Sequence, residues 1–160
     1  MPAPFFHYSF LNNTLIGSED PGVFGSSLKT ATQFCMAFNI RYMISLTPEY
    51  ENFCIEGLQR HHVPIEEMPS PSDMTKIFNI IEAGLSAHSS VWLHCQRGID
   101  RTGCVIGSYL VSKGHDPEEV ISELFLRFKK RINHPSLATL WHDKMEFIRT
   151  HAALGQEGGL

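Results

Sequence analysis

Hydrophobic positions along the chain fall into short continuous runs and into longer segments with helical spacing. The two kinds of segment alternate, which predicts strands interleaved with helices. Short apolar runs bounded by turn residues predict buried strands at residues 14–17, 42–46, 61–65 and 91–93. Longer segments with apolar positions at helical spacing predict helices at residues 26–38, 72–85, 102–112 and 135–151, and a further helix that begins at Asp116-Pro117. Pro64 places the third strand at a sheet edge, because proline cannot donate to a central ladder. The pattern favours an α/β fold, a mainly parallel central sheet of about four or five strands flanked by helices on both faces.

Length and composition are those of one soluble domain. We expect residues 1–154 to form a single domain and residues 155–160 to be a flexible tail. The formal net charge of −4 argues against a nucleic-acid partner, because general nucleic-acid binders are basic. No apolar run approaches the length of a membrane span, so no integral membrane contact is expected.

The N-terminal residues and the cysteines indicate a reducing compartment. The first residues lack the basic and apolar regions of a secretory signal. The four cysteines form no CxxC pair and no metal-ligand spacing, so we expect neither a metal nor a disulfide framework. A cytoplasmic monomer without a cofactor is the simplest expectation.

The most informative segment follows the predicted strand 91–93 and opens the next helix. It reads His94-Cys95-Gln96-Arg97-Gly98-Ile99-Asp100-Arg101-Thr102-Gly103. A strand that turns directly into a helix exposes backbone N–H groups and the positive end of the helix dipole, which favours a bound anion. Gly98 permits the positive φ that such a curl needs. The same field favours the thiolate form of Cys95, a nucleophile, and the guanidinium of Arg101 matches two phosphate oxygens.

The pattern HCxxGxxR followed by Thr-Gly resembles the signature of the cysteine-dependent protein tyrosine phosphatase superfamily and, by chain size, its small atypical dual-specificity branch. The resemblance implies the same α/β fold and hydrolysis of phosphate monoesters through a phosphocysteine at Cys95. His94 would orient the loop through hydrogen bonds, and the Thr102 hydroxyl would donate to the Cys95 sulfur. The phosphate would be bound by Gln96, Arg97, Gly98, Ile99, Asp100 and Arg101. No metal is required.

The proton donor for the leaving group is the point at which the chain departs from its family. The family uses an aspartate on a loop upstream of the signature, and this chain has none in that window. Glu67 lies four residues before Pro71, an offset that resembles the family's Asp-x-x-Pro-Pro pattern, and burial would favour the protonated form that the role requires. Glu66 is an alternative, and Asp73 and Asp100 are two rivals. Asp73 lies in the first turn of a predicted helix, where a capping role would suffice to explain it. Asp100 resembles an acid within the loop of myotubularin-type and Sac-type phosphoinositide phosphatases.

The substrate class stays open at the level of sequence. The short chain leaves no room for the deep phosphotyrosine pocket of larger family members, which favours phosphoproteins modified on tyrosine, serine or threonine. Arg97 makes Cys-x-Arg-Gly-x-x-Arg similar to a group of plant and fungal phosphatases that act on inositol pyrophosphates. The basic run 127–131 would extend such a surface or form a solvated helix end. A phosphoinositide or inositol phosphate is therefore the alternative ligand, and a phosphate-binding module without turnover is the second alternative.

Overall fold

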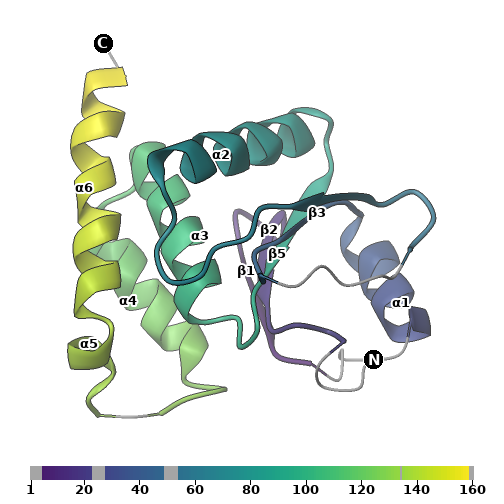
Figure 1. Ribbon diagram of the computed structural model, residues 1–160, viewed down its shortest axis with the longest axis horizontal. Coiled ribbons are helices and arrows are strands. Elements are labelled where there is room, and N and C mark those ends of the chain that lie inside the picture. Colours follow the sequence, from purple (N-terminus) through teal and green to yellow (C-terminus); the bar gives the residue numbers. More distant parts are fainter. Residues whose placement is uncertain (1–4, 23–27, 49–53, 134, 159–160) are drawn as a thin grey trace. The chain divides into compact units, whose positions relative to one another are not determined.

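The computed structural model describes residues 5–22, 28–48, 54–133 and 135–158 (Figure 1). Strands and helices alternate along the chain, as the hydrophobic pattern predicts. The elements are β1 (His7–Phe10), β2 (Leu15–Ser18), α1 (Leu28–Phe38), β3 (Ile40–Ser45), β4 (Gln59–His62), α2 (Pro71–Ser86), β5 (Ser90–His94), α3 (Asp100–Ser112), α4 (Pro117–Phe128), α5 (Leu137–Leu140) and α6 (His142–Gly158).

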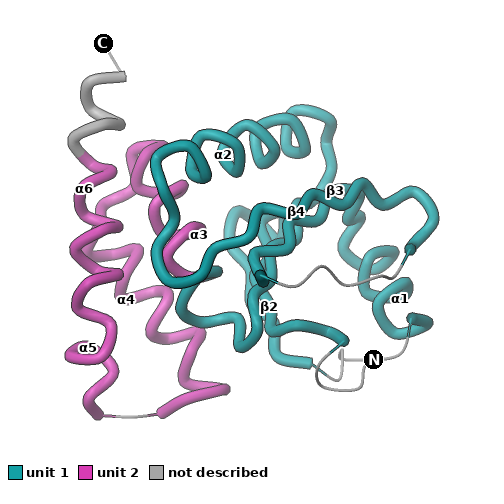
Figure 2. Tube along the Cα trace, viewed as in Figure 1, with its two compact units in different colours: residues 1–102 teal, residues 103–160 magenta. Residues whose placement is uncertain are grey.

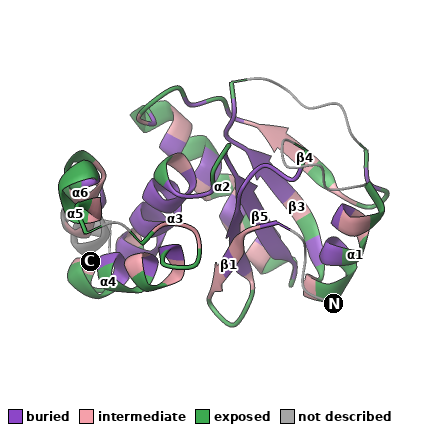
Figure 3. Cartoon of the chain, turned by 90° about the horizontal axis from the view of Figure 1, so that it is seen from below, coloured by how far each residue is buried: buried purple, intermediate pink, exposed green. Residues whose placement is uncertain are grey.

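The strands form one mixed sheet in the order β1-β2-β5-β3-β4. All neighbours are parallel except β1, which pairs antiparallel with β2 at one edge. The central strand β5 is buried at every residue, and Figure 3 shows the buried residues concentrated in this part of the molecule. The predicted fold class is confirmed, and β4 lies at an edge as Pro64 indicated.

Two strands differ from the prediction for local reasons. The sequence pattern missed β1, because its residues are mostly half-buried and it pairs with a single neighbour. Strand β4 ends at His62 rather than Ile65, because Pro64 interrupts the ladder. The chain still follows β3 beyond that point, since the N–H groups of Val63 and Ile65 donate to the carbonyls of Ser45 and Leu46.

Helices cover both faces of the sheet. On one face, α1 buries Phe34 against Trp92 of β5, with the two rings stacked at a centroid distance of 5.1 Å. On the other face, α2 approaches β5 through Gly84, where a Cβ would lie 2.5 Å from Val91. The adjacent residues Val91 and Trp92 therefore serve opposite layers, as strand geometry requires. The predicted start of α1 at residues 26 and 27 lies outside the described residues.

Close contacts divide the chain into two compact units, Met1–Thr102 and Gly103–Leu160, coloured separately in Figure 2. The division falls inside α3. A single domain over residues 1–154 stays a prediction. In the second unit, Gly103 and Gly107 lie one turn apart on α3 and let neighbouring helices approach closely. A Cβ at Gly103 would lie 2.7 Å from Phe128 of α4, and one at Gly107 would lie 2.7 Å from Ile148 of α6.

The last predicted helix is two helices, α5 and α6. Helix α6 continues to Gly158, four residues into the segment predicted as a tail. No helix in the described part of the chain is long and apolar enough to cross a membrane.

Candidate active site

The signature loop, residues 95–101, connects the carboxyl end of β5 to the first turn of α3. Gly98 lies at the predicted bend with φ of +79°. A Cβ at this position would lie 2.6 Å from the backbone of Ser18 and Glu19, so the loop lies directly against the segment that follows β2. Glycine is therefore required at residue 98 for both its conformation and its closeness to this backbone. The predicted strand, loop and helix arrangement is confirmed.

Three carbonyl groups of the signature region are held by hydrogen bonds from neighbouring elements. The His94 carbonyl accepts from the Leu46 N–H at 2.9 Å, and the Gln96 carbonyl accepts from the Asp20 N–H at 3.0 Å. The Gly98 carbonyl accepts from the phenol of Tyr8 at 2.7 Å. These contacts hold the loop from the segments that follow β2 and β3 and from the edge strand β1.

The signature side chains lie at different depths. Cys95 and Thr102 are buried, whereas Arg97 and Asp100 are exposed. The Thr102 hydroxyl makes no hydrogen bond with any residue of the described chain, so its predicted bond to the Cys95 sulfur stays a prediction. The half-buried Arg101 donates through Nη1 to the Ile65 carbonyl at 3.1 Å. That bond ties the signature arginine to the loop that carries Glu66 and Glu67.

His94 ends β5 and is fully buried. Its Nε2 lies 2.8 Å from the Ser45 hydroxyl. Burial lowers the pKa of His94 to about 4; the nearby Asp20 charge and the Cys95 backbone oppose this pKa shift, and Arg60 and Arg101 add to it. Its Nδ1 makes no hydrogen bond of normal geometry within the described residues, although the Cys95 backbone is close enough to favour the protonated form. The imidazole is therefore neutral near pH 7. This is the form expected of a buried group that supports the loop through hydrogen bonds.

The depressed pKa predicts that His94 makes the fold acid-sensitive. The unfolded chain takes up a proton near the ordinary pKa of 6.5, whereas the folded chain resists it until about pH 4. Stability is therefore complete above the unfolded value and falls as the pH is lowered towards the folded value, by up to about 3 kcal/mol. In urea unfolding, His94→Asn should lose less stability between about pH 7 and pH 4.5 than the wild type. The exposed His88→Asn should behave as the wild type does, and equal slopes for His94→Asn would contradict the assignment.

The candidate acids occupy distinct environments. Glu66 and Glu67 are both exposed, so the burial that a glutamic acid needs for the donor role must come from bound substrate. Asp73 forms a capping box at the start of α2, where its carboxylate accepts from the Ser70 N–H and its own N–H donates to the Ser70 hydroxyl. Asp100 opens α3 as the acidic residue of its first turn.

Sequence reasoning missed two acids beside the signature loop. Glu19 and Asp20 directly follow β2, and both are buried. The Glu19 carboxylate accepts from the Phe6 N–H, and the Asp20 carboxylate accepts from the Gly22 N–H, each at 2.8 Å. The signal that could have found them is their position, because residues after the carboxyl end of a parallel strand converge on the binding crevice of such sheets.

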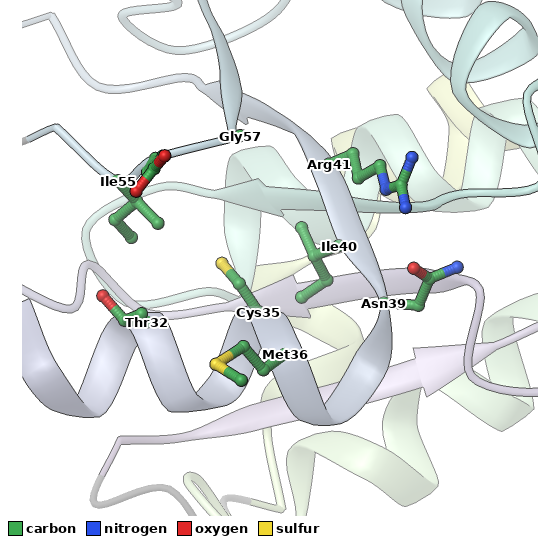
Figure 4. Close-up of a pocket in the computed structure, with 9 residues that line it drawn as sticks. Thr32, Cys35, Met36, Asn39, Ile40, Arg41, Ile55 and Gly57 are labelled. Carbon is green, nitrogen blue, oxygen red and sulfur yellow. The ribbon is translucent and has the colours of Figure 1, made fainter.

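A separate cavity of about 510 Å³ lies at the other end of β3 (Figure 4). Ile40, Met36 and Ile55 contribute its apolar lining. Because Ile40 begins β3 and the parallel β5 reaches the signature loop at its far end, this cavity is not part of the candidate active site. Cys35 also lines it, and burial raises the pKa of that thiol to about 11, so Cys35 stays protonated at neutral pH. Within the described residues, no group of three or more metal-ligating side chains gathers.

Comparison with known families assigns the chain to one of them. A family model described as "Polymorphic toxin system, DSP-PTPase phosphatase" matches residues 21–115, which include β5, the signature loop and α3. The chain belongs to this DSP-PTPase family. The family predicted from the HCxxGxxR signature is confirmed.

A viral phosphatase is among the relatives of this DSP-PTPase. The dual specificity protein phosphatase OPG106 of vaccinia virus is 25% identical over 95 residues, which cover 57% of this chain and 55% of that protein. The chain thus spans about half the length of this curated relative.

Solved structures extend the fold similarity over nearly the whole chain. PTPMT1 in complex with PI(5)P has a TM-score of 0.73 at 15% identity, covering 97% of this chain and 99% of that one. The core catalytic domain of the PP-IP phosphatase SIW14 from S. cerevisiae has a TM-score of 0.64 at 16% identity, covering 97% and 92%. At 15% and 16% identity, these similarities show only that the DSP-PTPase shares the fold of the two solved structures.

Proposed function

We propose that this DSP-PTPase hydrolyses phosphate monoesters through a phosphocysteine intermediate, with phosphoproteins as substrates. The observation that carries the proposal is the curled loop of residues 95–101 between β5 and α3, with Cys95 at its start and Arg101 at its end. The N–H groups at the start of α3 and the guanidinium together suit a dianionic phosphoryl group. A module that only binds phosphate would not need the nucleophile that this loop retains.

In the first chemical step, the Cys95 sulfur attacks phosphorus as the bond between phosphorus and the leaving oxygen breaks. The electron pair of that bond stays on the leaving oxygen, which takes a proton from a general acid. Arg101 and the loop amides stabilise the charge on the equatorial phosphoryl oxygens during transfer. The products of this step are an alcohol or phenol and a phosphocysteine.

In the second step, water attacks the phosphocysteine, gives a proton to the carboxylate formed in the first step, and releases inorganic phosphate and the Cys95 thiolate. We assign Thr102 as the donor to the departing sulfur, because its buried hydroxyl has no other hydrogen-bond partner among the described residues. His94, held by Ser45, orients the start of the loop.

We assign Glu67 as the general acid. Arg101 holds the Ile65 carbonyl, two residues before Glu67, so the loop that carries this glutamate is tethered to the phosphate-binding arginine. Glu66 shares that tether and its exposure. The capping box accounts for Asp73 without catalysis, whereas Asp100 remains the rival within the signature loop.

Inositol phosphates or phosphoinositides are the second candidate substrates. The exposed Arg97 adds a second cation within the signature loop, which would attract a ligand with several phosphates. PTPMT1, solved in complex with PI(5)P, and the PP-IP phosphatase SIW14 share this fold, which is consistent with the alternative. We expect the enzyme to act in the cytoplasm, because a catalytic cysteine needs a reducing compartment, and we expect it to be a monomer.

A substrate panel tests the proposed function. Initial rates on p-nitrophenyl phosphate, phosphopeptides, water-soluble phosphoinositides and inositol pyrophosphates, at equal concentration, should give the highest kcat/KM for phosphopeptides. Arg97→Gln should change phosphopeptide rates little, because a single phosphate is bound by Arg101 and the loop amides. A preference for inositol ligands that Arg97→Gln removes would replace the phosphoprotein assignment. Binding of phosphate without turnover of any substrate would leave only a binding module.

A further inference from the structure

Tyr8 of the edge strand β1 reaches the signature loop across its neighbouring strand. It pairs with Gly17 of β2, and its phenol donates to the Gly98 carbonyl at 2.7 Å. The ring is buried, although β1 is an edge strand and the neighbouring residues of that strand are half-buried. A residue 90 positions before the loop thus contacts its central glycine.

Gly17 makes this contact possible. A Cβ at residue 17 would lie 2.6 Å from Cζ and 2.7 Å from the hydroxyl oxygen of Tyr8. Any larger residue would therefore displace the end of the phenol ring, which is the part that reaches Gly98. The absence of a side chain at Gly17 therefore allows Tyr8, on the edge strand, to contact the loop.

The direction of the Gly98 carbonyl determines the direction of the next amide. In a trans peptide the C=O and the following N–H point to opposite sides, and the described chain contains no cis peptide. By holding the Gly98 carbonyl on the side of β1, Tyr8 directs the Ile99 N–H to the side away from β1. The backbone N–H of Asp20 holds the Gln96 carbonyl in the same manner, but only a proline substitution, which also restrains the backbone, would remove that donor.

We propose that Tyr8 is a positioning residue of the phosphate-binding loop, whose hydroxyl holds the Gly98–Ile99 peptide so that its N–H faces the transferring phosphoryl group. This inference rests on the proposed function. A purely structural role would depend on the ring, which contacts Phe6 and Phe10, and not on the hydroxyl. A Tyr8→Phe substitution, which removes the hydroxyl and keeps the ring, therefore separates the two roles.

Tyr8→Phe tests the proposal, with Tyr42→Phe on β3 as the matched control. The ring contacts remain in Tyr8→Phe, so its midpoint of thermal unfolding should stay within about 2–4 °C of the wild type, the shift that the loss of a typical single hydrogen bond produces in a domain of this size. On p-nitrophenyl phosphate, kcat should fall about tenfold with KM little changed, because a misdirected donor costs less than a deleted one. The inhibition constant of orthovanadate should rise by a similar factor. Tyr42→Phe should match the wild type in all three measurements.

Gly17→Ala supplies an independent probe through a double-mutant cycle. In the wild type it should lower kcat, because the added methyl group displaces the Tyr8 hydroxyl from Gly98. In the Tyr8→Phe background it should have little further effect, since the hydroxyl is already absent. Unchanged kcat and vanadate inhibition in Tyr8→Phe would overturn the positioning role, and so would an equal effect of Gly17→Ala in both backgrounds. If the wild type neither hydrolyses p-nitrophenyl phosphate nor binds vanadate, the proposed function fails and this inference fails with it.

Discussion

Cys95→Ser should abolish turnover of p-nitrophenyl phosphate while the chain stays folded and still binds inorganic phosphate. A serine hydroxyl in the same loop is not ionised at neutral pH, so the nucleophile is lost, whereas the loop amides and Arg101 remain. We expect the rate to fall by more than about a thousandfold, as for other catalytic nucleophiles. Steady-state rates and phosphate binding by calorimetry measure the two effects. Activity within about tenfold of the wild type would contradict the assignment of Cys95.

Arg97→Lys and Arg101→Lys provide a matched comparison within the same loop. Both substitutions keep the charge and remove the planar fork of the guanidinium. Arg101→Lys should be severe, because the fork is assigned to the phosphoryl oxygens and also reaches the Ile65 carbonyl. Arg97→Lys should be mild on a substrate with one phosphate. Because both variants retain the charge, near-wild-type turnover in Arg101→Lys would show that loop charge, and not the fork of Arg101, governs turnover, and equal losses in the two variants would show that the fork of Arg101 has no special role.

Glu67→Gln should slow hydrolysis of poor leaving groups far more than good ones. A general acid matters most when the departing oxygen holds its negative charge poorly, so an alkyl or serine phosphate should lose about 10²–10⁴-fold. An aryl phosphate with an acidic phenol should lose much less, and the alkaline limb of the pH–rate profile should flatten. Rates across a series of leaving groups give the dependence directly.

The other candidate acids are the controls for this experiment. Glu66→Gln and Asp73→Asn should cause small losses that do not depend on the leaving group, because Asp73 acts in the α2 capping box. If Asp100→Asn alone shows the dependence, the proton comes from within the signature loop and the loop after Ile65 is not catalytic. That outcome would also favour phosphoinositide substrates.

The signature loop could be predicted from sequence because its determinants are local. The apolar run 91–93, the helix that follows and Gly98 between them are close in the chain, and each has a direct effect on backbone geometry. The bend at Gly98 follows from that short segment, whereas the burial of Cys95 does not and is a finding of the structure. The capping role of Asp73 is likewise predictable from its place in the first turn of a helix, although the sequence alone also leaves it as a rival acid.

The surroundings of the loop could not be predicted because they depend on strand pairing. Tyr8 reaches Gly98 only because β1 pairs with β2 in a register that places Gly17 beneath the ring. Glu19 and Asp20 contact the site region because β2 lies beside β5, although more than seventy residues separate them in the chain. The two neighbouring glutamates differ for another reason: Glu66 and Glu67 share one exposed loop, so the assignment of Glu67 rests on its four-residue offset from Pro71.

The central claim is that a phosphoryl group resides on Cys95 during turnover. A rapid denaturing quench of the wild-type enzyme in the presence of p-nitrophenyl phosphate, followed by peptide mass spectrometry, tests this claim most directly. We predict phosphate on the peptide that contains Cys95, and none on that peptide in Cys95→Ser. Turnover with phosphate on another residue, or with no covalent phosphate even when its hydrolysis is made rate-limiting, would contradict the account.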